Sequence, residues 1–166
     1  MRKIEILSPA GSMESLKAAI NASCDAIYIG GDKFGARAYA DNLNDDLMGG
    51  AIDYAHIHDK KIYLTVNTLL KNSELEQELY DYLVKYYEQG IDAVIVQDVG
   101  VLHFIHENFP NMDIHASTQM TLTMAEGANV LKQMGITRLV TSRELGLEEI
   151  ANIRKGTDLE IETFVH

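Results

Sequence analysis

Polar and ionisable side chains follow most of the short apolar runs in this 166-residue sequence. One group could take part in acid and base chemistry, or hold a divalent metal that activates water. Its members are Asp98, His115, Glu144 and His166. A second group carries amide, hydroxyl and guanidinium groups that could bind and orient a small carboxylate. Its members are Asn67, Ser117, Thr118, Gln119 and Arg143.

A further cation lies in a glycine-rich segment, residues 30–38, which contains Gly30, Gly31, Gly35 and Arg37. A guanidinium can form two parallel hydrogen bonds to a carboxylate or a phosphate. We therefore count Arg37 among the substrate-binding candidates. A flexible turn with a surface arginine explains the same segment equally well.

Each candidate also has a purely structural explanation. Asp98 directly precedes a helical stretch and could cap it, and Arg143 and Glu144 could form an ordinary surface ion pair. Side chains that follow parallel strands, however, gather at one end of a barrel, where catalytic groups are found. Because the candidates would share that end, we favour a functional site there.

The elements that would position these residues alternate along the chain. Short β-rich apolar runs predict strands at 4–7, 26–30, 62–66, 93–97, 113–116, 138–141 and 159–165. Helical periodicity predicts helices at 13–22, 45–59, 74–89, 100–108, 124–134 and 147–155. This alternation is typical of a parallel sheet with crossover helices. No linker or low-complexity tract interrupts it, so we treat residues 1–166 as one domain.

Two α/β folds accommodate this alternation, an open doubly wound sheet and a TIM-like (β/α) barrel. The first turn, residues 8–12 (SPAGS), lacks the GxGxxG spacing of nucleotide-binding doubly wound sheets. We therefore predict an incomplete TIM-like (β/α) barrel of about seven strands and six helices. Closure normally takes eight strands and about 250 residues, so we expect a truncated domain. Its outer strands would keep unpaired edges, and we expect self-association through them.

Composition narrows the choice of partners. The formal net charge of -11 gives no general attraction for a phosphate backbone, so a nucleic acid would need a local patch of cations. No 18-residue apolar run or signal peptide is present, which predicts a cytoplasmic protein with no membrane partner. Cys24 is the only cysteine, so no internal disulfide can form, and we interpret it as a buried small residue.

Several motifs, spread over essentially the whole chain, resemble the collagenase-like peptidase family, peptidase family U32. They are residues 7–12 (LSPAGS), 28–31 (YIGG), 34–38 (FGARA), 65–68 (TVNT), 114–119 (IHASTQ), 142–145 (SREL) and 164–166 (FVH). The resemblance implies a TIM-like barrel, followed in family members by a segment with cysteines. In members that act as hydroxylases those cysteines hold an iron-sulfur cluster. We therefore expect no cofactor in this fragment alone, and expect the fragment alone to be inactive.

The resemblance leaves the reaction open between alternatives. The first hypothesis is the amino-terminal barrel of a collagenase-like peptidase, with a protein or peptide substrate and a divalent metal held by the acid and histidine group. The alternative is part of an iron-sulfur, prephenate-dependent hydroxylase of tRNA or rRNA. In that case Arg37 and Arg143 would bind a prephenate-like carboxylate. The non-catalytic alternative is an anion-binding domain centred on Arg37.

Overall fold

The computed structural model describes residues 4–36 and 43–165 of the chain. Its strands are β1 (Leu7–Ala10), β2 (Ala26–Gly30), β3 (Lys61–Val66), β4 (Ala93–Val96), β5 (Asp113–Ala116), β6 (Ile136–Val140) and β7 (Glu160–Glu162). Its helices are α1 (Met13–Asn21), α2 (Asp45–Ile57), α3 (Asn72–Gln77), α4 (Leu79–Gln89), α5 (Val99–Asn108), α6 (Ala125–Gln133) and α7 (Leu147–Gly156). A single 3₁₀ turn, η1 (Thr118–Met120), follows β5.

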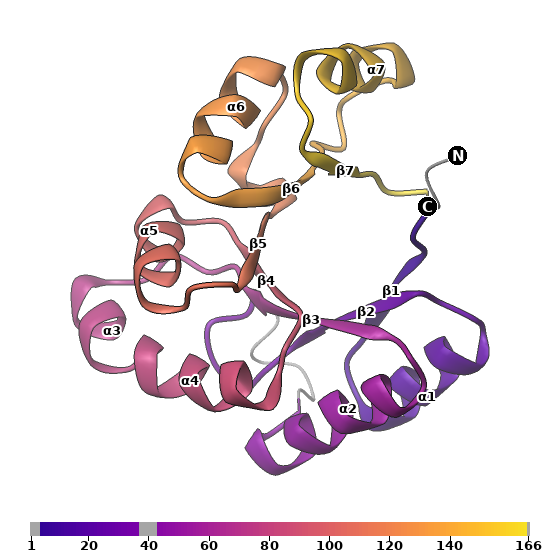
Figure 1. Ribbon diagram of the computed structural model, residues 1–166, viewed down its shortest axis with the longest axis vertical. Coiled ribbons are helices and arrows are strands. Elements are labelled where there is room, and N and C mark those ends of the chain that lie inside the picture. Colours follow the sequence, from indigo (N-terminus) through magenta and orange to yellow (C-terminus); the bar gives the residue numbers. More distant parts are fainter. Residues whose placement is uncertain (1–3, 37–42, 166) are drawn as a thin grey trace.

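The strands form one parallel sheet in which each strand pairs with the next one along the chain. Figure 1 shows them curving round in an arc, with the helices on its outer side. Within the described residues β1 and β7 are the two edges, and they face each other across the opening of the arc. The prediction of an incomplete TIM-like barrel is confirmed. Self-association through the two edges stays a prediction.

Side-chain alternation along the strands separates two environments. One set of strand residues, which includes Ile29, Leu64 and Val94, packs against the helices and is fully buried. Apolar helix residues such as Leu16 and Leu102 complete this outer core. Removing such apolar surface from water contributes about 25 cal/mol per Å², so this layer is the main source of stability.

The other set of strand residues faces the inside of the arc, and its composition is mixed. A small apolar cluster of Ala26, Tyr63, Ala93 and Ile95 lies there, separate from the outer core. Buried polar residues, His115 and Arg138 among them, lie on the neighbouring strands β5 and β6. Polar groups inside the barrel must find partners or face a cavity, because an unpaired buried polar group is costly.

Several predicted elements differ from the structure in their bounds: the strands predicted at 138–141 and 159–165 lie at Ile136–Val140 and Glu160–Glu162, and two further elements differ as follows. The first strand was predicted at 4–7 but lies at Leu7–Ala10, and Ile4 and Ile6 are 84% and 58% exposed. Pro9 can occupy this strand because β1 pairs on one side only, with β2, and proline has no N–H to donate. The helix predicted at 74–89 is divided into α3 and α4 at Glu78, whose φ of -120° is not helical.

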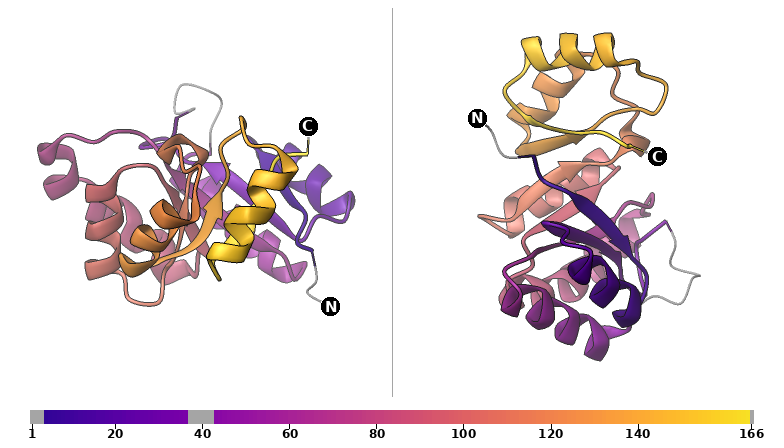
Figure 2. Two further views of the ribbon diagram at one scale, coloured as in Figure 1. Left: turned by 90° about the horizontal axis from the view of Figure 1, so that it is seen from above. Right: turned by 90° about the vertical axis from the view of Figure 1, so that its right-hand side faces the viewer.

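The chain enters the barrel at one end and leaves it at the other, as the left view of Figure 2 shows. Every pair of neighbouring strands is parallel, so the strands all end at the same end of the barrel. Within residues 4–36 and 43–165, no helix is long and apolar enough to span a bilayer.

Candidate functional site

A cavity of about 490 Å³ lies at the carboxyl ends of the strands. We call it the mouth. Its polar lining comprises Thr65, Asn67, Ser117, Thr118, Gln119, Arg143 and Glu162. Its apolar lining includes Tyr28, Ile95, Val140 and Phe164. Every strand of the sheet therefore contributes a residue from its carboxyl end or from the loop that follows it, as in TIM-barrel active sites.

The structure brings together five of the six predicted substrate-binding residues. Asn67, Ser117, Thr118, Gln119 and Arg143 all line the mouth. The sixth, Arg37, lies outside the described residues. Parallel strands of matched register explain this result, because the residues after β3, β5 and β6 all emerge at one end.

Some of these polar side chains also hold the loops of the mouth in place. The Asn67 Oδ1 atom accepts a hydrogen bond from the main-chain N–H of Ala36 at 2.9 Å, which fixes the loop after β2. Thr118 Oγ1 donates to the carbonyl of Thr141 at 3.0 Å, joining the loops after β5 and β6. Arg143 instead stacks on Phe164, with its Cζ 3.8 Å from the ring centroid. Within the described residues its guanidinium has no hydrogen bond or ion pair, so it can bind an anion.

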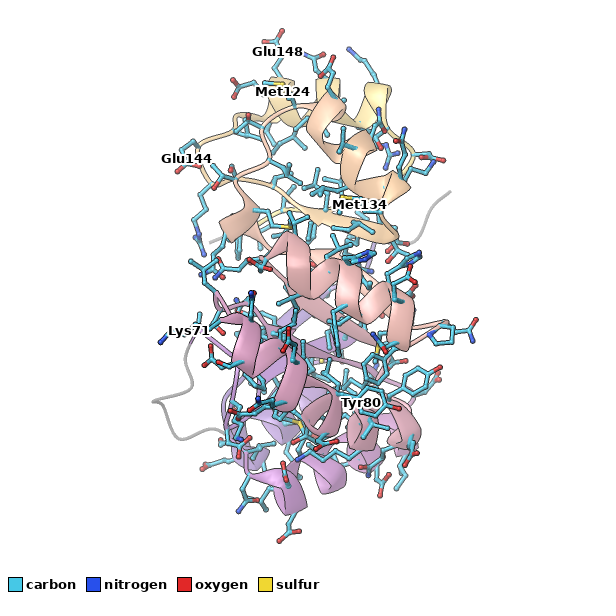
Figure 3. The ribbon with its side chains drawn as sticks, turned by 90° about the vertical axis from the view of Figure 1, so that its left-hand side faces the viewer. Lys71, Tyr80, Met124, Met134, Glu144 and Glu148 are labelled. Carbon is cyan, nitrogen blue, oxygen red and sulfur yellow. The ribbon has the colours of Figure 1, made fainter. Side chains whose placement is uncertain are left out.

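The predicted group of Asp98, His115, Glu144 and His166 is not assembled in the described part of the chain. Asp98 caps α5, accepting the main-chain N–H of Val101 at 3.0 Å. Glu144 is exposed, and Figure 3 shows it projecting from the outer edge of the molecule. His166 lies outside the described residues. Over residues 4–36 and 43–165, no three His, Cys, Asp or Glu side chains lie close enough together to hold a metal ion.

His115 is the member of this group whose position differs most from the prediction. It lies within β5, as the predicted strand at 113–116 implies, but it pairs in register with Arg138 of β6 and does not line the mouth. Its side chain is 3% exposed and meets the Tyr63 ring edge to face, with centroids 4.8 Å apart. Burial, with Arg138 nearby as a second cause, lowers the pKa of His115 to about 3. A neutral imidazole packed inside the barrel fits a structural role better than a catalytic one.

The sequence reasoning missed a cluster of charged residues inside the barrel. Arg138 Nη1 donates to Glu5 Oε1 at 2.6 Å, and Arg138 Nη2 donates to Glu160 Oε2 at 2.7 Å. The Tyr63 hydroxyl donates to the same Glu5 oxygen at 3.0 Å. We call Glu5, Tyr63, His115, Arg138 and Glu160 the Arg138 layer. Alternation in residues 160–162 (EIE) was the available signal, because it places Glu160 and Glu162 on one face.

The residues present do not fit an iron-sulfur cluster, which is held by several cysteine thiolates. Cys24, the only cysteine of the chain, is 2% exposed, packs in the outer core and does not line the mouth. Burial raises the pKa of its thiol, which disfavours the thiolate that binds metals. Cysteine ligands for a cluster would have to come from outside these 166 residues.

The sequence profile of Peptidase family U32 matches residues 11–166. The chain belongs to this family. A 23S rRNA 5-hydroxycytidine synthase of Escherichia coli is 41% identical over 99% of the chain. A tRNA hydroxylation protein P of Haemophilus influenzae is 39% identical over 99% of it. A protein of Methanocaldococcus jannaschii named as an uncharacterized protease is 35% identical over the whole chain.

This U32 chain covers only part of each of these relatives, namely 24%, 36% and 41% of their respective lengths. Among solved structures, the U32 peptidase Mk0906 has a TM-score of 0.74 at 14% identity, with 98% of this chain and 70% of that one covered. Tryptophan synthase from M. tuberculosis has a TM-score of 0.66 at 12% identity, with 97% and 73% covered. These likenesses support the barrel fold.

The names of the relatives bear on the two enzymatic hypotheses. Several relatives are named for hydroxylation of tRNA or rRNA, and the M. jannaschii relative is named as an uncharacterized protease. The hydroxylase alternative is therefore better supported than the peptidase hypothesis that the sequence analysis placed first.

Proposed function

We propose that this U32 barrel is the substrate-binding part of an RNA-hydroxylating protein, with the mouth as the place where substrate binds. The relatives named for rRNA and tRNA hydroxylation, at 38% to 41% identity over nearly the whole chain, support the proposal. Because the chain covers less than half of each, the reaction is proposed for a longer protein that contains this barrel.

The composition of the mouth is the observation that carries this proposal. Its lining combines the Arg143 guanidinium with amide and hydroxyl groups and with the rings of Tyr28 and Phe164. Aromatic rings stack on nucleobases, and amides and hydroxyls bind their edges. Arg143 is suited to hold the carboxylate of a prephenate-like cosubstrate. An iron-sulfur cluster, where present, would be bound by cysteines outside this chain and would supply the redox chemistry.

The electrostatics of the chain favour recognition of one nucleotide over general attraction to RNA. A formal net charge of -11 repels a phosphate backbone, so the affinity for RNA cannot rest on counterion release over a broad surface. We expect the contacts of the base in the mouth to contribute more than backbone contacts from this barrel.

Deletion of the gene in its native host tests the proposal. We expect hydroxylated uridine in tRNA, or hydroxylated cytidine in 23S rRNA, to disappear from the nucleosides measured by mass spectrometry. The full-length wild-type gene should restore the modification. Unchanged levels of both nucleosides in the deletion strain would reject the proposal.

The peptidase hypothesis has a separate test, because the M. jannaschii relative carries a protease name. If the peptidase hypothesis is correct, the purified full-length protein should cleave denatured collagen. His115→Ala and Glu144→Ala variants should lose this activity if those residues act on a peptide. We expect no cleavage by the wild-type protein.

A further inference from the structure

Glu162, the last residue of β7, has a carboxylate oxygen with no hydrogen-bond partner in the described structure. The side chain is 18% exposed, and its Oε2 atom is buried without a hydrogen bond. Glu162 lines the mouth and also a second cavity of about 510 Å³ beside β1 and β7. A carboxylate with an unbonded buried oxygen, in a residue that borders a cavity, is poised for a donor that the protein itself does not supply.

Arg138 forms an ion pair with Glu162 but does not donate a hydrogen bond to this oxygen. Its Nη1 lies 3.6 Å from Glu162 Oε2, which is too long for a hydrogen bond. The same Nη1 donates to Glu5 at 2.6 Å, while Nε and Nη2 donate to Glu160 at 3.0 and 2.7 Å. Three of the five N–H groups of Arg138 thus donate to Glu5 and Glu160, and none of these bonds goes to Glu162.

The surroundings of Glu162 in the mouth indicate the chemistry of the missing donor. Tyr28 and Phe164 line the same cavity and present flat rings, and Arg143 lies on the Phe164 ring. Flat aromatic surfaces favour a planar ring as ligand. A carboxylate favours the N–H edge of such a ring, as Asp and Glu do when they accept from a base. It disfavours another carboxylate.

We propose that the Glu162 carboxylate accepts a hydrogen bond from an N–H group on the edge of the nucleobase that enters the mouth. The inference rests on the proposed function, and adds to it the residue that reads the base. It assigns Glu162 to substrate specificity and Arg138 to positioning, because the Arg138 ion pairs hold the strands from which Glu162 projects. Arg143 is left for the anionic group of the second substrate.

A dependence on pH follows from the surroundings of Glu162. Burial is the main cause that raises the pKa of Glu162. The positive charge of Arg138 lowers this pKa in part, and the negative charge of Glu5 raises it further. The titratable and charged groups on the elements around it are Glu5, Tyr28, Tyr63, His115, Arg138, Arg143 and Glu160. Protonation of Glu162 removes its negative charge and leaves a weaker, neutral acceptor, so base binding should weaken at acid pH, at a pH above that for an ordinary exposed carboxyl.

The test uses the full-length protein with Glu162→Met, Glu162→Gln and the control Glu160→Gln. Methionine has a similar length but no comparable acceptor, and glutamine keeps a neutral acceptor. Glu160 lies two residues away on β7 and pairs with Arg138, but it does not line the mouth. Affinity is measured for tRNA and 23S rRNA purified from the deletion strain, and hydroxylation is measured by complementation of that strain.

We expect Glu162→Met to weaken RNA binding or kcat/KM by about 10- to 100-fold, and Glu162→Gln to fall between it and wild type. In wild type and in Glu160→Gln, the KM for RNA should rise as the pH falls. In Glu162→Met this rise should be absent. Circular dichroism establishes that each variant is folded. If Glu162→Met fails to fold, the test uses the RNA affinity of Glu162→Gln and the dependence of its KM on pH.

Three outcomes would overturn or separate the two proposals. Wild-type complementation with equal activity of both Glu162 variants would reject the role of Glu162 and leave the proposed function intact. An equal loss in Glu160→Gln and Glu162→Met would mean that both carboxylates serve only the Arg138 ion pairs. Absence of any hydroxylation by the wild-type gene would reject the proposed function itself.

Discussion

The mouth and the Arg138 layer occupy the same barrel and are both polar, but they differ in how their groups are partnered. In the Arg138 layer the guanidinium, two carboxylates and a phenol bind one another. His115 Nδ1 is the exception in that layer, since it is buried without a hydrogen bond. In the mouth, within the described residues, the exposed Arg143 guanidinium makes a ring contact but no hydrogen bond, and Glu162 Oε2 is buried without one. Removing one member of a set of buried charges that satisfy one another destabilises the fold, because it leaves the others without a partner, whereas unsatisfied groups beside a cavity are available to a ligand.

This difference predicts that substitutions in the Arg138 layer change stability, and that those in the mouth change binding. The predictions that follow are ordered by their expected effect on the free energy of unfolding. A substitution that changed both the free energy of unfolding and substrate binding would contradict this division between the Arg138 layer and the mouth.

Arg138→Met should have the largest effect on stability. The substitution leaves Glu5 and Glu160 without their shared cation, and the Arg138 side chain is only 9% exposed. Glu160 is 52% exposed and keeps much of its hydration, so we expect the lower end of the range for a broken buried pair, about 3 kcal/mol. Urea unfolding measures the difference.

Lys33→Met is the matched control, because it also removes a cation from an ion pair with a glutamate. The Lys33 and Glu78 side chains, 2.9 Å apart, are both about half exposed. Solvent screening should limit its effect to below about 1 kcal/mol. Equal destabilisation by Arg138→Met and Lys33→Met would contradict a stabilising role for the Arg138 layer.

His115 should make stability fall in mild acid. Its pKa is about 3 in the folded chain and about 6.5 when exposed, so the unfolded chain binds the proton first as pH falls. The stabilising contribution is complete above about pH 6.5 and is lost progressively towards pH 3. By about pH 5 the loss should reach about 2 kcal/mol. Urea unfolding of wild type and His115→Gln at about pH 7.5 and about pH 5 should show this loss in wild type alone.

Sequence patterns predicted the alternation of strands and helices, and with it the gathering of Asn67, Gln119 and Arg143 at one end. Such residues follow strands, and a parallel sheet places all strand ends together. The same patterns could not tell whether His115 lies in the mouth or below it. That distinction depends on register, because His115 pairs with Arg138 and packs on Tyr63 from a distant strand.

Glu162 was missed for a related reason. An alternating acidic segment is equally consistent with an exposed edge strand and with a barrel interior, and only the pairing of β7 with β6 decides between them. Likewise, Asp98 could be a helix cap or a site residue until its bond to the Val101 N–H was known. Local chemistry could be predicted from the sequence, and the partners across strands could not.

Asn67→Ala should have a smaller effect, about 1 kcal/mol, because it removes one hydrogen bond to the main-chain N–H of Ala36. The loop after β2 should become less ordered at the mouth, which should also weaken substrate binding. Asn129→Ala is the matched control, since Asn129 Nδ2 makes one bond of 2.9 Å to the carbonyl of Gly156 away from the mouth. Urea unfolding should show similar losses, and substrate binding should fall only in Asn67→Ala.

Arg143→Met should have the smallest effect on stability and a clear effect on binding. Arg143 is exposed and its described contact is the stacking on Phe164, which the methionine side chain can replace in part. Unfolding should therefore change by less than about 0.5 kcal/mol. Calorimetric titration of the full-length protein with prephenate should show affinity reduced by about tenfold or more, because a charge-assisted bidentate contact is lost.

Lys71→Met separates this contact from a general effect of charge. Lys71 is an exposed cation after β3 and does not line the mouth, and Figure 3 shows it at the same edge of the molecule as Glu144. Lys71→Met removes the same unit of charge as Arg143→Met, but at a position outside the mouth. Because exposed charges are screened within about 8 Å at physiological salt, this variant should leave the affinity for prephenate nearly unchanged. Equal losses in both variants would mean that the mouth attracts anions through its overall field. A loss in Arg143→Met alone would mean that the guanidinium itself holds the carboxylate.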